Sequence, residues 1–529
     1  MQLTGEQLIG YQMIRGKGRE LLAINPENQQ AISTPVFNCA TADIVDQACE
    51  LAEQAFDPFR AIAPETRARF LEAVADGILE LGSTLIERAH IETGLPLARL
   101  EGERGRTAGQ LRLFATVLRQ GRWQSATFDT ALPDRQPLPR PDLRLCKIAL
   151  GPVVVFGASN FPLAFSVAGG DTASALAAGC PVVVKAHCAH LGTSELVGRV
   201  IQAAARRLEL PEGTFSLVVG DGSDVGQQLV SHPAIKAVGF TGSRSGGLAL
   251  MRAAAARPEP IPVYAEMSSI NPVFLLPGAL AHRANTIATA FVDALVMGAG
   301  QFCTNPGVVL AVEGPDLEAF LAQAAASLSE KAAQTMLTPG IHAAYEKGVN
   351  RVSGEVGIQP VASGKAQSGE SQAQGHLYQT TFASLSSNAG LLEEVFGPAA
   401  IVIRCQCVED MLAFARSVEG QLTATLHMED ADQNIAQGLV QAMEKKAGRI
   451  LVNGFPTGVE VCDSMVHGGA FPATSDSRTT SVGSTAIERF LRPVCYQNFS
   501  DALLPEALKQ DNPLHVWRQI DGQPTAPLR

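Results

Sequence analysis

The sequence is poor in charged and aromatic residues and carries no surplus of positive charge. Charged residues make up 18% of the 529 residues, and aromatic residues make up 5%. Lysine and arginine number 41 against 52 acidic residues, which gives a net charge of −11. Nucleic acids and anionic membranes both attract proteins with a basic surface. We therefore expect neither partner, although local hydrogen-bond donors can still bind a small anion.

Long apolar runs are missing as well. No apolar stretch approaches the roughly 18 residues that span a bilayer. Residues 1–10 lack the basic and apolar regions of a secretory signal. These absences predict a soluble, cytoplasmic protein without a membrane partner.

Cysteine is sparse, with ten residues in the chain and no pair or cluster at the spacing of zinc ligands. We therefore expect no metal site, and a buried thiol in a reducing compartment is the default for each cysteine. Cys303 departs from that default because it lies in residues 298–307, between glycines and a proline. Backbone N–H groups in such a loop can lower the pKa of a thiol and later stabilise an oxyanion.

The length predicts about three structural units, at roughly 150 residues each. Residues 43–120 have helical periodicity. Four prolines in residues 133–141 exclude a helix and favour an extended arm, which could pair with the C-terminal tail or with a neighbouring subunit. The expected units are a first domain of residues 1–130 and 148–268, a second of residues 269–465, and an arm with a tail of residues 131–147 and 478–529.

Short apolar runs alternate with helical ones between residues 148 and 266, and again after residue 269. Strands that are apolar on both faces are typical of a parallel sheet covered by helices. Ligands of such sheets bind beyond the carboxyl ends of the strands. The expected strands are residues 153–156, 181–185, 215–219, 235–240 and 262–265, then residues 272–276 and 308–312.

Candidate functional residues follow three of these strands. Asn160 comes after the first strand and fits either an ordinary turn or a donor into the crevice. Gly242, Ser243 and Gly247 lie in a turn that opens a helix, where a pyrophosphate could bind, although a serine cap explains them equally well. Glu266 ends the fifth strand, either as a solvated group at the sheet edge or as a base in the crevice.

Together with the Cys303 loop, these segments resemble the NAD(P)-dependent aldehyde dehydrogenase superfamily, from the Glu-Thr-Gly of residues 92–94 to the Glu-Val-Phe-Gly-Pro of residues 394–398. The resemblance implies an α/β fold: a Rossmann-type parallel-sheet cofactor domain, an α/β catalytic domain and a small β oligomerisation arm. It implies that Cys303 is the nucleophile, Glu266 the general base and Asn160 the oxyanion donor. The family's use of arm and tail between subunits implies a homodimer or homotetramer.

By the same resemblance the cofactor is NADP or NAD. Lys185 falls where the family binds the adenine ribose, Glu394 and Phe396 fall at the nicotinamide ribose and ring, and the glycine-rich turn falls at the pyrophosphate. NAD-preferring members carry a glutamate where this chain has Cys188, which neither binds both ribose hydroxyls nor repels a 2′-phosphate. We therefore expect NADP to be accepted alongside NAD, with Lys185 and His187 near the phosphate.

Three segments, residues 266–272, 300–307 and 467–483, resemble the branch of the superfamily that oxidises α-ketoglutaric semialdehyde (2,5-dioxopentanoate). That branch implies 2-oxoglutarate as the product, with medium or long-chain aliphatic aldehydes as the alternative substrates. The candidates for binding the substrate carboxylate are Arg283, Arg449 and Arg478. The residues expected to line the substrate tunnel are Phe161, Phe165, Gln301 and Phe302.

Two rival functions remain open on the sequence. A thiol esterase would use Cys303 without redox chemistry, and a dinucleotide-binding protein would leave that cysteine inert. The esterase has no use for the phosphate-binding turn or for Lys185. The binding protein leaves unexplained why a nucleophile, a base and an oxyanion donor occur together.

Overall fold

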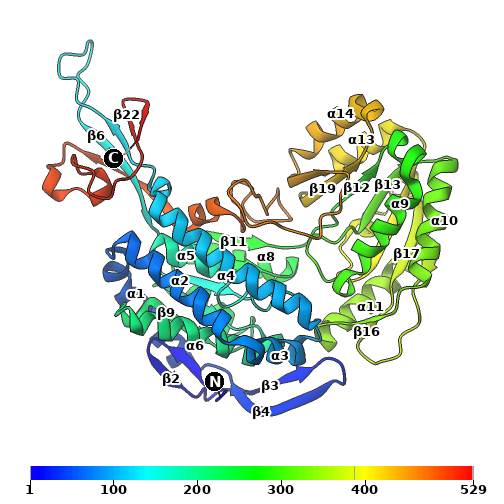
Figure 1. Cartoon of the computed structure of the whole chain (residues 1–529), viewed down its shortest axis with the longest axis horizontal. Coiled ribbons are helices and arrows are strands. Elements are labelled where there is room, and N and C mark those ends of the chain that lie inside the picture. Colours follow the sequence, from blue (N-terminus) through cyan, green and yellow to red (C-terminus); the bar gives the residue numbers. More distant parts are fainter. Residues whose placement is uncertain (1, 386–387, 527–529) are drawn as a thin grey trace.

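The computed structural model describes residues 2–385 and 388–526. Residue 1 and residues 527–529, which belong to the expected first domain and tail, lie outside the described residues. Two seven-stranded sheets, each flanked by helices, form two separate bodies, and a five-stranded sheet projects from one end (Figure 1). The chain therefore has the expected α/β fold.

The first sheet has five parallel strands in the order β9-β8-β7-β10-β11, extended at the β9 edge by two antiparallel strands. The strand order reverses between β7 and β10, as in a Rossmann fold, so ligands are expected at that point. All five predicted strands are confirmed to within two residues, whereas β1 and β2 are too short to have been predicted. The strands are β1 (Gln7–Ile9), β2 (Gln12–Ile14), β7 (Val153–Phe156), β8 (Val182–Lys185), β9 (Phe215–Val218), β10 (Ala237–Thr241) and β11 (Val263–Glu266).

Eight helices of the described chain belong to this first body. The predicted helical stretch is confirmed, with a break where Gly94 adopts φ 66° and Pro96 precedes the next helix. Their bounds are α1 (Ala42–Arg60), α2 (Pro64–Glu80), α3 (Gly82–Thr93), α4 (Leu97–Gln120), α5 (Gly170–Ala178), α6 (Leu191–Arg207), α7 (Val225–Ser231) and α8 (Arg244–Ala255).

The second sheet has six parallel strands and one antiparallel edge strand, in the order β15-β17-β18-β13-β12-β19-β20. Its strands are β12 (Val273–Leu275), β13 (Val308–Val312), β15 (Gln359–Ser363), β17 (His376–Thr381), β18 (Ala399–Cys405), β19 (Gln421–His427) and β20 (Ala447–Val452). Its helices are α9 (Pro277–Val296), α10 (Pro315–Ser329), α11 (Pro339–Ser353), α12 (Phe382–Leu385), α13 (Val408–Ser417) and α14 (Gln433–Met443). Two short ladders complete the described strands of both bodies: β3 (Glu20–Asn25) with β4 (Gln30–Asn38), and β14 (Gln334–Thr335) with β16 (Gln372–Ala373).

The projecting sheet joins the arm to the tail of the same chain. Strand β6 (Leu143–Ala149) pairs antiparallel with β21 (Leu491–Gln497) along its whole length. The expectation of an extended arm that pairs with the tail is wrong for the proline-rich residues 133–141, which form turns closed by a single bridge between Leu132 and Arg140. Proline lacks the N–H that a ladder needs, so pairing begins only beyond the last proline. The remaining strands of this sheet are β5 (Thr127–Asp129), β22 (Arg518–Ile520) and β23 (Gln523–Thr525).

Membrane insertion finds no support in the helices. Within residues 2–385 and 388–526, none of them combines the length and the apolar character that crossing a bilayer requires.

Candidate active site

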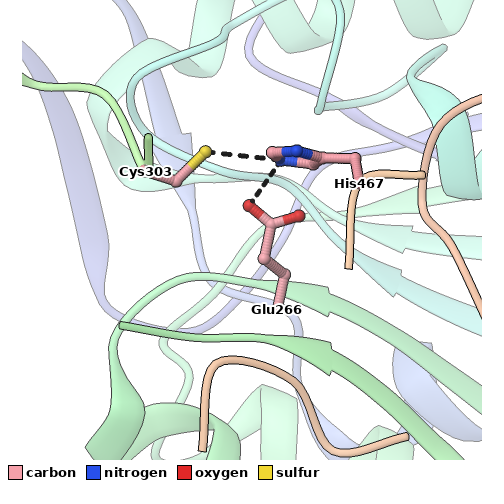
Figure 2. A group of neighbouring side chains, drawn as sticks. All are labelled: Glu266, Cys303 and His467. Carbon is pink, nitrogen blue, oxygen red and sulfur yellow. Dashed lines mark hydrogen bonds and ion pairs between the residues drawn. The ribbon is translucent and has the colours of Figure 1, made fainter. Parts of the chain in front are cut away.

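Three side chains from distant segments meet between the two bodies (Figure 2). Sγ of Cys303 lies 3.4 Å from Nε2 of His467, and that nitrogen lies 3.0 Å from Oε1 of Glu266. Glu266 and His467 are only 2% and 1% exposed, while Cys303 is half-buried. The nucleophile and base predicted from the sequence are therefore neighbours, joined by an imidazole that the sequence analysis did not single out.

The loop that presents Cys303 is shaped by three left-handed residues. After α9 the chain turns through Gly298, Ala299 and Gly300, with φ angles of 56°, 57° and 65°. A Cβ atom on Gly300 would come within 2.3 Å of the backbone of Gly397, so only glycine fits there. Nδ2 of Asn271 donates to the carbonyl of Cys303 at 2.8 Å and fixes the loop from the other side.

Glu266 is buried and paired. It forms a bridge with Thr474, which holds the segment carrying His467 against the end of β11. Oε2 of Glu266 accepts a hydrogen bond from Oγ of Ser481 at 3.1 Å. Burial acts to raise the pKa of Glu266, but the charge that His467 carries when protonated, together with its hydrogen bond, holds that pKa below its ordinary value. The reading of Glu266 as a solvated group at the sheet edge is therefore wrong.

The pKa of Cys303 shifts opposite to the sequence expectation. Burial and the negative charge of Glu266 raise the pKa of this thiol well above its ordinary value. The backbone N–H groups of the loop do not outweigh these two effects. At neutral pH the free enzyme therefore holds a neutral thiol, and attack on a substrate requires a base to take its proton. Nε2 of His467 lies in contact with the sulfur and can do so.

Asn160 lies beside the nucleophile loop. Its Nδ2 donates to the carbonyl of Gln301 at 3.0 Å, and its own carbonyl accepts from Nη2 of Arg99 at 2.6 Å. An amide nitrogen carries two hydrogens, so a second N–H remains for a ligand. Asn160 therefore contacts the nucleophile loop at Gln301, two residues before Cys303.

Three phenylalanines form an apolar wall next to the thiol. The ring of Phe161 meets those of Phe165 and Phe302 edge-on, at centroid distances of 5.4 and 5.5 Å. They adjoin a cavity of about 350 Å³, which Phe161 and Phe302 line. The expected lining role of Gln301 is wrong: its side chain is fully buried, with Nε2 donating to Gly298 and Oε1 accepting from Leu337 N–H. It supports the loop instead.

The expected carboxylate-binding arginines have other partners. Arg283 pairs with Glu429, Arg478 pairs with Asp476, and Arg449 donates to backbone carbonyls. The cavity instead contains Arg99 and Arg106, which the sequence analysis missed. Their spacing of seven on one helix was the available signal, because such residues share a helix face.

Lys185 ends β8 as a buried ammonium. Nζ donates to the carbonyls of Ala186 and Gly220, at 2.8 and 3.2 Å, and no described carboxylate forms an ion pair with it. An ammonium has three hydrogens, so one donor is left. A buried cation of this kind fits a ribose hydroxyl or a phosphate at a strand end.

His187 and Cys188 follow Lys185 at the same edge. Burial, together with His190 and Lys185, lowers the pKa of His187 well below its ordinary value, so this ring is neutral. Cys188 is exposed. Close by, Arg19 pairs with Asp221 at 2.8 Å, and this arginine supplies a cation that the sequence reading did not find.

The glycine-rich turn has the predicted form. It links β10 to α8, and Oγ of Ser243 caps the helix by accepting from the N–H of Gly246 at 3.2 Å. Gly242 is exposed, while Gly247 packs against Met267, whose sulfur would lie 2.6 Å from an added Cβ. Ser243 can cap the helix while the turn binds a phosphate, because the cap uses only the N–H of Gly246. Other backbone N–H groups at the helix N-terminus can still contact an anion.

Glu394 and Phe396 line a second pocket at the nucleophile loop. Both line it together with Phe302 and Asn305. Burial raises the pKa of Glu394 to about 8, although a backbone hydrogen bond from Ser269 opposes the shift. The structure thus brings these residues to the nucleophile loop, where a ligand could reach them.

A sequence profile described as the aldehyde dehydrogenase family matches residues 13–491. The chain belongs to that family. It is 59% identical to alpha-ketoglutaric semialdehyde dehydrogenase 2 of Azospirillum brasilense, over 99% of this chain and 100% of that protein. It is 50% identical to the alpha-ketoglutaric semialdehyde dehydrogenase of Acinetobacter baylyi, over 98% of both chains.

Solved structures agree on the fold. Aldehyde dehydrogenase C of Pseudomonas syringae, solved with NAD+ and octanal, superposes with a TM-score of 0.80 at 21% identity, over 95% of this chain and 98% of that one. Lactaldehyde dehydrogenase of Escherichia coli superposes with a TM-score of 0.81 at 21% identity, over 94% and 100%. The family match and the two relatives above show that the chain is an oxidoreductase, so the esterase and binding-protein readings are set aside.

The ligand atoms of Glu266, Cys303 and His467 lie within 4.8 Å of one another, close enough to surround a metal ion. The same set of thiol, imidazole and carboxylate is also what an activated nucleophile requires. Because aldehyde oxidation needs the thiol free to attack carbon, we interpret the cluster as a nucleophile with its base. The expectation of no metal stays a prediction.

Proposed function

We propose that this aldehyde dehydrogenase oxidises 2,5-dioxopentanoate to 2-oxoglutarate with NAD(P)+, by way of a thioester on Cys303. The observation that carries the proposal is the contact of Cys303 with His467 and of His467 with Glu266, next to a cavity that holds two arginines. The identity to two alpha-ketoglutaric semialdehyde dehydrogenases over nearly the whole chain supports this substrate.

In the acylation half of the reaction, Sγ of Cys303 bonds to the aldehyde carbon while Nε2 of a neutral His467, whose own proton is on Nδ1, takes the thiol proton. The imidazolium that results donates from Nε2 to Oε1 of Glu266. Nδ2 of Asn160 and the N–H of Cys303 stabilise the resulting oxyanion, an effect of about 3 kcal/mol for one well-placed donor. The bound nicotinamide supplies the acceptor for the hydride that leaves this carbon. A thioester on Cys303 results.

In the second half, Glu266 activates the water that hydrolyses the thioester. Its pKa lies below the ordinary value, so the carboxylate is ionised at neutral pH and can accept a proton. Ser481 orients the carboxylate through Oε2. The products are the free acid and the regenerated thiol.

For the cofactor we propose that NADP is used alongside NAD. Support comes from position 188, where this chain has a cysteine and no carboxylate to repel a 2′-phosphate. Lys185 adds to it, because the third N–H of its ammonium is unused. Because His187 is neutral, it offers a hydrogen bond and no charge, and the nearby Arg19 is paired with Asp221. Ser243 with its flanking glycines would hold the pyrophosphate, and Glu394 with Phe396 the nicotinamide riboside.

The roles of the three structural units, the oligomeric state and the cellular location are also proposals. We assign the first body to the cofactor and the second to the thiol, with the arm and tail as a third unit. The β6–β21 ladder leaves an extended sheet that supports a homodimer or homotetramer. A cytoplasmic location suits a mechanism that requires a reduced thiol.

The proposed function is tested with a panel of aldehydes and both cofactors. We expect kcat/KM to be highest for 2,5-dioxopentanoate, above succinic semialdehyde, glycolaldehyde and hexanal, with NADP+ and NAD+ both reduced. Absorbance of NAD(P)H follows the rate, and chromatography identifies 2-oxoglutarate. Preference for hexanal would favour the aliphatic alternative, and strict use of NAD+ would overturn the cofactor proposal.

Replacing the imidazole tests the first step. We expect His467→Gln to slow acylation at neutral pH by about 10²- to 10³-fold, because the thiol of Cys303, whose pKa is raised, then loses the imidazole that takes its proton. Since higher pH ionises the thiol directly, the rate of the variant should climb towards alkaline pH. Stopped-flow measurement of the NAD(P)H burst gives the profile, with the exposed His282→Gln as the matched control. An unchanged profile in His467→Gln would rule out this role.

A further inference from the structure

The guanidinium of Arg106 has hydrogen-bond donors without partners. Within the described residues, Nε and Nη2 of Arg106 are both buried and donate a hydrogen bond to no protein acceptor. Arginine loses little charge on burial because its pKa is so high. A buried guanidinium with two adjacent free N–H groups requires an acceptor from outside the chain.

Aromatic rings hold this group at the substrate cavity. The guanidinium carbon of Arg106 lies 5.8 Å from the ring centroid of Phe161 and 5.1 Å from that of Phe165. Arg106 lines the same cavity of about 350 Å³ as Phe302. Phe302 directly precedes Cys303 in the chain, so Arg106 lies on the side of the reacting thiol. Cation–π contacts therefore fix a cation next to the wall that leads to the nucleophile.

Resting on the proposed function, we propose that Arg106 binds the carboxylate of the substrate through Nε and Nη2. These two N–H groups lie side by side and match the two oxygens of a carboxylate. Nη1 of Arg99, also buried and without a partner, adds a donor. Nη2 of Arg99 already donates to the backbone carbonyl of Asn160.

Glu103 is the only acidic residue among the described residues that line this cavity, and it cannot neutralise both Arg99 and Arg106. Oε1 of Glu103 accepts from the N–H groups of Leu163 and Ala164, at 2.8 and 3.0 Å. One carboxylate against two guanidiniums leaves the cavity positive. Its phenylalanine wall suits methylene groups. The site therefore selects aldehydes with a short apolar chain and a terminal carboxylate over neutral aldehydes of equal length.

The test compares two five-carbon aldehydes that differ in charge. In Arg106→Gln, kcat/KM for 2,5-dioxopentanoate should fall about 100-fold, mainly through KM, while kcat/KM for pentanal stays within about threefold. Arg106→Lys should restore only part of the loss, because it keeps the charge without the paired donors. Arg112→Gln, on the same helix but exposed and paired with Asp76, is the matched control and should change neither substrate.

A second measurement needs no variant. Glutarate should inhibit pentanal oxidation competitively in the wild-type enzyme, and far more strongly than its uncharged diamide. Equal inhibition by the two compounds, or an equal loss for both aldehydes in Arg106→Gln, would overturn the role of Arg106. Failure of the wild-type enzyme to oxidise 2,5-dioxopentanoate would instead overturn the proposed function.

Discussion

Cys303→Ala is expected to lower NAD(P)H formation by at least about 10⁴-fold, because hydride leaves only from carbon bonded to this sulfur. The fold should survive the change. The loop is held through the carbonyl of Cys303 by Asn271 and through the side chain of Gln301, and neither contact uses the sulfur. Steady-state absorbance with saturating aldehyde measures the effect.

Cys407→Ala is the matched control for this variant. Cys407 is exposed at the start of α13, far from the cavity residues in sequence, and its loss should leave the rate unchanged. An unaltered melting temperature in both variants separates lost chemistry from lost structure. Turnover by Cys303→Ala comparable to that of the wild type would remove the thioester scheme altogether.

Glu266→Gln is expected to separate the two halves of the reaction. The amide keeps the size of the carboxylate but cannot take a proton from water, so steady-state turnover should fall about 10²- to 10⁴-fold. Acylation should persist, giving a burst of one NAD(P)H per active site. Stopped-flow and steady-state assays of one sample resolve the burst from the slow phase.

The same variant changes the pH dependence of the burst in a defined direction. The negative charge of Glu266 raises the pKa of Cys303, so its removal should lower that pKa. The thiolate then forms at lower pH, and the burst profile should move towards acid. Glu259→Gln, an exposed carboxylate paired with Lys236, should leave both the burst and its profile unchanged. A variant without a burst, or with normal turnover, would contradict the role of Glu266.

Much of the fold was predictable because the strands of both sheets are short and apolar on both faces. Val153–Phe156 and Val308–Val312 were predicted to the residue, since each run ends abruptly at glycine or at charged and polar residues. The short strands β1 and β2 were not predicted, because three residues carry too little periodicity.

Part of the site was predictable and part was not. Cys303 stands out in the sequence because glycines surround it, and Glu266 because it ends a buried strand. His467 does not stand out, since its role depends on contact with a residue 164 positions away. The pKa directions of Cys303 and Glu266 follow from the same contact, so they required the structure as well. The spacing of seven between Arg99 and Arg106 places them on one helix face, but only the structure shows that this face lines the cavity.

The central claim is a covalent acyl group on one sulfur, and it can be observed directly. Glu266→Gln, mixed with 2,5-dioxopentanoate and NADP+ and quenched in acid during the slow phase, should carry one 2-oxoglutaryl group per chain. Peptide mass spectrometry should place that group on Cys303 and on none of the other nine cysteines. Formation of NADPH with Cys303 unmodified, or an acyl group at another residue, would contradict the account.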